Sequence, residues 1–72
     1  MWMDELMFQV NQDINGGLIA DCLTEAISSQ AHSWEELRRN VRKAVAAFYF
    51  DRLGAPERVR LQLVRDEVLV QQ

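Results

Sequence analysis

Four acids near the N-terminus could in principle do metal chemistry. Asp4, Asp13, Asp21 and Glu25 are the candidates, because two cations held by carboxylates stabilise in-line phosphoryl transfer in nucleases. Such a site needs three or four convergent carboxylates, and Asp13 is better explained as a turn former. We therefore predict no metal site, and a residual metal-dependent nuclease stays as the least favoured of three functions.

His32 and Cys22 are each the only residue of their type in the chain. A catalytic triad needs a nucleophile and an orienting acid around the histidine, and the serines near His32 are not set in a G-x-S-x-G elbow. We expect His32 to serve a loop or a helix cap. Cys22 has no companion at zinc-binding spacing and cannot form an internal disulfide. We predict no catalytic residue, no cofactor and no enzyme activity.

The N-terminal pattern predicts a β-hairpin. Residues 6–12, LMFQVNQ, alternate apolar and polar side chains, which is the period of a half-buried strand. DINGG, residues 13–17, consists largely of residue types that accept positive φ, and the apolar run LIADCL follows it. A short polar stretch and a C-terminal alternating stretch complete the strands. The predicted strands span about residues 5–12, 17–23, 26–32 and 58–71.

A capping box predicts where the helix begins. In Ser33-Trp34-Glu35-Glu36, the Ser33 hydroxyl accepts the backbone N–H of Glu36, whose carboxylate reaches back to Ser33. Apolar residues then recur three and four positions apart, opposite a basic side. Gly54 and Pro56 supply the stop signals. The predicted helix spans about residues 33–53.

The order β-β-β-α-β predicts one small α+β domain over residues 1–72, in which one long helix covers an antiparallel sheet. A single helix covers one face only. Met7, Ile19 and Val64 lie out of phase with the main apolar set, and Val68-Leu69-Val70 does not alternate. We therefore expect an apolar uncovered surface that a homo-oligomer, dimer or tetramer, or a permanent partner would cover.

The net charge of −3 argues against general binding of nucleic acids. The first 36 residues contain acids and no Lys or Arg, whereas Arg38, Arg39, Arg42 and Lys43 form a basic cluster. The acidic part favours a basic protein partner. No signal peptide and no apolar run of about 18 residues is present, so we expect a cytoplasmic protein that does not enter a membrane.

Several short motifs, in this order, resemble HicB-like antitoxins. The first group is FQV, DINGG and LIA within residues 8–20, and the second is SQAHSWEEL with NVRKAV within residues 29–45. The departures are Ala31, where this family commonly has Gly, and Lys43, where it commonly has Glu.

The resemblance implies a reduced ribonuclease-H-like fold without the catalytic carboxylates. It also implies a partner, a small basic HicA-like toxin that cleaves mRNA, and we expect Asp13, Asp21 and Glu25 to contact it. Full-length HicB proteins carry a C-terminal DNA-binding module that this sequence lacks, so no direct DNA binding is expected. The alternative to an antitoxin is an orphan homo-oligomeric scaffold without a toxin partner.

Overall fold

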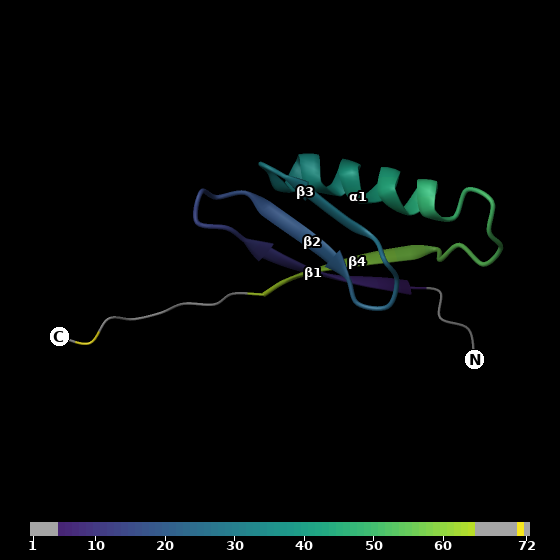
Figure 1. Ribbon diagram of the computed structural model, residues 1–72, viewed down its shortest axis with the longest axis horizontal. Helices are drawn as coiled ribbons and strands as arrows, with labels where there is room; N and C mark the ends of the chain where they lie inside the picture. Colours follow the sequence, from purple (N-terminus) through teal and green to yellow (C-terminus); the bar gives the residue numbers. More distant parts are fainter. Residues whose placement is uncertain (1–4, 65–70, 72) are drawn as a thin grey trace.

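The computed structural model describes residues 5–64 and 71, which form a four-stranded sheet with one helix on one face (Figure 1). The strands are β1 (Glu5–Gln12), β2 (Leu18–Cys22), β3 (Ser28–Ala31) and β4 (Arg58–Leu63), and the helix is α1 (Trp34–Phe48). The prediction of a two-layer α+β domain is confirmed. The part of the predicted strand region 58–71 that follows Val64 lies outside the described residues except for Gln71.

The sheet is mixed, so the prediction of an antiparallel sheet is wrong for β4. The strand order is β3-β2-β1-β4, and β1 is antiparallel to β2 but parallel to β4. The cause is the connection after β3. Because α1 carries the chain back along the sheet, β4 runs in the same direction as β1 and lies beside it.

The core forms where the strand and helix periodicities meet. Leu6, Phe8 and Val10 alternate along β1 and are buried, as the sequence predicted. Leu37 and Val41 lie on the matching stripe of α1 and are also buried. The remaining buried apolar residues are Leu18, Ala20, Ile27, Ala31 and Val45.

The helix ends five residues before the predicted boundary of 53. It stops at Phe48, and the backbone N–H groups of Phe50 and Arg52 then donate to carbonyls three residues earlier, in tighter turns. Phe50 and Leu53 are 89% and 100% exposed, so further helical turns would bury no apolar surface there. Gly54 has a φ of +86° but lies in the following loop, away from the end of α1.

Within the described residues, no helix is both long and apolar enough to cross a membrane.

Within the four described strands, the face of the sheet that α1 leaves uncovered is mainly polar. Val64, which follows β4, is 38% exposed, and Val68-Leu69-Val70, on which the expectation of an apolar surface also rested, lie outside the described residues. Met7 and Ile19 do lie on this face and are half-buried. Ile19 stands opposite Asn11, so it lies about 13 Å from Met7 along β1 at about 3.3 Å per residue. The two side chains therefore form no continuous patch. The other described residues on this face of the four strands are Glu5, Gln9, Asn11, Asp21, Ser28, Gln30, Arg58, Arg60 and Gln62.

An ion pair joins the two parallel strands on this face. The Glu5 carboxylate accepts hydrogen bonds from Arg60, at 3.0 Å from Nε and 3.1 Å from Nη2, and Arg58 Nε lies 3.9 Å away. The hydrogen bond from Arg60 is the main cause that lowers the pKa of Glu5, and the same bond raises the pKa of Arg60. The pair therefore favours the parallel register of β1 and β4.

Replacing Leu37 by Ala should destabilise the domain by about 3 kcal/mol, because it removes a fully buried side chain and leaves a cavity. The matched control is Leu53→Ala, at a fully exposed leucine. It should change the free energy of unfolding by less than about 0.5 kcal/mol. Urea unfolding of both variants measures this, and equal losses would contradict the assigned core.

The Glu5 pair predicts a dependence of stability on pH. Because the pKa of Glu5 is lower in the folded state, the pair stabilises the fold above the unfolded pKa, and this stabilisation is lost as pH falls through the folded pKa. Glu5→Gln should therefore lower the melting temperature near neutral pH, and its difference from the wild type should vanish in acid. Thermal melts across this pH range measure the effect. Glu57→Gln, at an exposed acid in the loop before β4, should give a curve parallel to that of the wild type.

Candidate functional site

The turn between β1 and β2 is closed by Asp13. Its Oδ1 accepts the backbone N–H groups of Asn15 at 2.8 Å and Gly17 at 3.0 Å. Gly16 has a φ of +87°, which a residue with a side chain adopts at a cost. A Cβ on Gly17 would lie 3.0 Å from Asp13 Oδ2. The prediction that Asp13 forms the turn is confirmed. A side chain at Gly16 or Gly17 would be sterically unfavourable.

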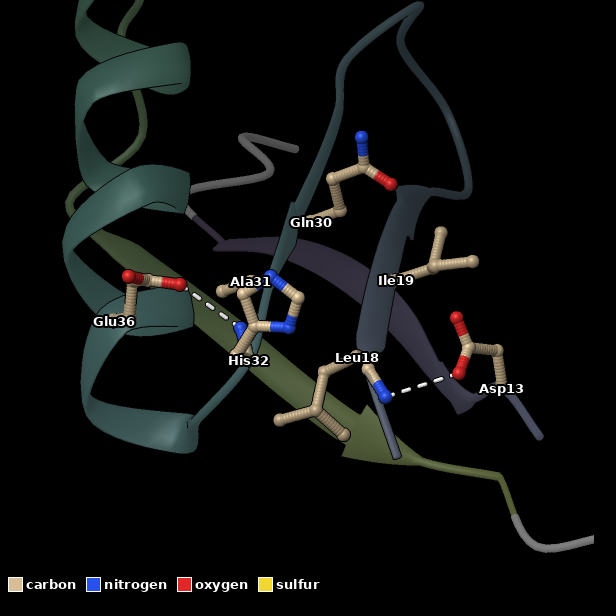
Figure 2. A pocket seen from close by; sticks show the side chains of 8 residues that line it. Asp13, Leu18, Ile19, Gln30, Ala31, His32 and Glu36 are labelled. Atoms are coloured by element: carbon tan, nitrogen blue, oxygen red, sulfur yellow. Dashed lines mark hydrogen bonds between the residues drawn. The ribbon is translucent and has the colours of Figure 1, made fainter. Parts of the chain in front are cut away.

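A shallow pocket of about 200 Å³ lies beside this turn, where the hairpin, β3 and the start of α1 meet (Figure 2). Asp13 and Glu36 lie on opposite sides of Leu18 in this view. The residues that line the pocket are Asp13, Gly17, Leu18, Ile19, Gln30, Ala31, His32 and Glu36.

The capping box differs from the predicted one in a single bond. The backbone N–H of Glu36 donates to Ser33 Oγ at 3.1 Å, as predicted. Glu36 Oε1 accepts the N–H of His32 at 2.9 Å, one residue before the expected Ser33. The carboxylate of Glu36 is thus used locally, and the His32 backbone serves the cap, in agreement with the role predicted for His32.

Asp21 lines a second shallow hollow, of about 350 Å³, over β2 and β3. Cross-strand pairing places Asp21 opposite Ser28, and Ile19 opposite Gln30. Ile19 and Gln30 line both hollows, so Asp13 and Asp21 lie at the two ends of one surface. We call this surface the acidic strip; its residues are Asp13, Ile19, Asp21, Ser28 and Gln30.

Glu25, the third predicted contact residue, lies apart from Asp13. It is half-buried in the turn between β2 and β3. The pKa of Tyr49 is raised mainly by burial and, to a smaller extent, by the negative charge of Glu25. The structure therefore brings two of the three predicted acids onto one surface and places Glu25 near the C-terminal end of α1.

The sequence did not indicate Ser28 and Gln30 as site residues, because their place follows from the register of β3 on β2. Ile19 was singled out only as an apolar residue out of phase. If the pairing of β2 with β3 were known, the alternation of side chains along both strands would place Ser28 and Gln30 on the same face as Ile19 and Asp21.

Among residues 5–64 and 71, no group of three His, Cys, Asp or Glu side chains could hold a metal ion. Asp4, one of the four acids considered for a nuclease, lies outside the described residues. Cys22 Sγ lies 3.8 Å from Thr24 Oγ1.

Comparison of the chain with protein-family models, with curated proteins and with solved structures gave no match.

Asp13→Ala should cost about 1 kcal/mol of stability, because two backbone N–H groups lose their acceptor. Asp13→Asn keeps the carbonyl acceptor and should stay close to the wild type. Urea unfolding and hydrogen exchange at Asn15 and Gly17 measure both variants. An equal loss in Asp13→Asn would show that charge, and not the turn, is the important property.

Proposed function

We propose that this domain is a non-enzymatic protein-interaction module that binds a small basic protein through the acidic strip. The observation that carries the proposal is the position of Asp13 and Asp21 at the two ends of one exposed surface, with Ile19 between them. Asp21 is exposed, and no cation pairs with it within the described residues. An apolar side chain flanked by carboxylates offers both hydrophobic contact and charge recognition.

The distribution of charge over the sheet supports a basic partner. The strip lies on β2, β3 and the hairpin turn, and the first 36 residues contain no Lys or Arg. The arginines on the same face belong to β4, which is two strands away from β2. This separation is about 10 Å at about 4.8 Å between neighbouring strands. Arg60 is also paired with Glu5. A cationic surface approaching β2 and β3 thus meets carboxylates first.

The motif resemblance gives the class of partner. HicB-like antitoxins neutralise small basic HicA-like ribonucleases, and the β-β-β-α-β element order supports assigning this domain the same role. We therefore propose an antitoxin that covers the RNA-binding surface of a HicA-like toxin. As part of the same proposal, we infer that the fold is a reduced form of the ribonuclease-H-like fold.

A homo-oligomeric scaffold is the second candidate, and one observation favours it. β4 ends the sheet, and Leu63 and Val64 at its end are 48% and 38% exposed. Pairing of two such edges would bury them. A stable dimer or tetramer in light scattering, together with no partner recovered from lysate, would favour the scaffold.

The test is co-expression with a HicA-like toxin, and a reading frame for such a toxin beside the gene would support the proposal. The wild type should restore growth and co-purify with the toxin. Asp13→Asn combined with Asp21→Asn should weaken binding about tenfold, since two exposed charge contacts are lost while the turn is kept. Glu57→Gln is the matched control and should bind as the wild type does. If the toxin stayed active and no complex formed, the antitoxin proposal would be wrong.

A further inference from the structure

A second surface lies on the helix side of the sheet, between α1 and β4. It is an open groove of about 320 Å³. Trp34, Arg38, Val41 and Arg42 line one wall, and they follow the i, i+4, i+7, i+8 spacing of one helical stripe. Val59 and Leu61 of β4 form the floor. Trp34 is not a core residue, because 36% of its surface is exposed in this wall.

Among the described strands, the floor of the groove borders the outer edge of the sheet. β4 is the last strand of the order β3-β2-β1-β4 and pairs with β1 on its inner side. The outer backbone N–H and C=O groups of such a strand can pair with an added extended segment. Alternate side chains of that segment would then point to the α1 side, over Val59 and Leu61.

The rim of the groove carries positive charge without acidic partners. Arg38 and Arg42 are exposed, and within the described residues neither forms an ion pair. Arg39, on the same helix but outside the groove, differs because it lies 3.6 Å from Glu35. Two guanidinium groups one helical turn apart beside an indole ring are suited to carboxylates.

From this combination we infer that the groove binds an extended peptide whose groove-facing residues alternate between apolar and acidic. The peptide adds as a fifth strand at the outer edge of β4. Its apolar side chains lie on Val59 and Leu61 beside Trp34, and its carboxylates bind Arg38 and Arg42. This site is independent of the acidic strip, which lies on the other face of the sheet and selects the opposite charge.

The probe is a fluorescein-labelled eight-residue peptide of threonine, valine and glutamate, in which valine and glutamate alternate on one face. Fluorescence anisotropy with the full chain measures binding. The peptide should bind at least about tenfold more tightly than the same peptide with lysine in place of glutamate. N-methylation of the amides that face β4 should abolish binding, because the added strand loses its backbone hydrogen bonds.

Variants locate the site. Arg38→Gln with Arg42→Gln should weaken binding of the glutamate peptide about tenfold. The matched control Arg39→Gln should leave it unchanged. In a Trp2→Phe background, an unlabelled copy of the peptide should shift the emission of Trp34 to shorter wavelength.

Three results would overturn the inference. These are equal affinity for the lysine peptide, unchanged affinity in the Arg38 and Arg42 double variant, and unchanged Trp34 emission. A fourth is self-association, measured by light scattering, that the double variant abolishes, because the groove would then belong to a second copy of the chain. The peptide results leave the toxin experiment unaffected, because that experiment tests the other face, whereas self-association would favour the homo-oligomeric scaffold.

Discussion

The whole domain depends on the burial of one apolar stripe of α1 against one face of a small sheet. Leu37, Val41 and Val45 belong to one buried cluster with Phe8 and Val10, and within the described residues no polar side chain is buried with them. A chain of 72 residues buries little apolar surface, so the loss of packing in this one core would remove most of its stability. In the part of the chain that the structure describes, every buried side chain is apolar, so the polar and charged groups lie at the surface.

This constraint divides the surface into two regions of different charge. The helix covers one side of the sheet and carries an exposed basic rim, while the uncovered side presents carboxylates along β2 and the hairpin turn. Because a single layer of strands separates the two regions, each can be occupied without displacing the other. The proposed functions of the two faces are thus compatible in one small molecule.

The sequence predicted the local structure well where local rules decide it. The alternation of Leu6, Phe8 and Val10, the turn at Asp13 and the Ser33 cap were all found in the structure. Each depends on residues within a few positions of each other.

What could not be predicted depends on contacts between distant segments. The parallel direction of β4 follows from the path of α1 over the sheet, and the end of the helix follows from the lack of a surface to cover Phe50 and Leu53. The candidate site was half predicted: Asp13 and Asp21 were named, but their alignment through Ile19 and Gln30 required the strand register. The partial exposure of Trp34 likewise depends on how far α1 lies from β4.

The bond between Glu5 and Arg60 joins residues 55 positions apart in the sequence. The pairing of β1 with β4 therefore closes a loop that contains most of the chain. The β1–β2 hairpin and the helix form through contacts between residues that are close in the sequence. Closure over such a length is entropically costly and contributes no contacts until it is complete. We therefore expect the pairing of β4 with β1 to form late during folding.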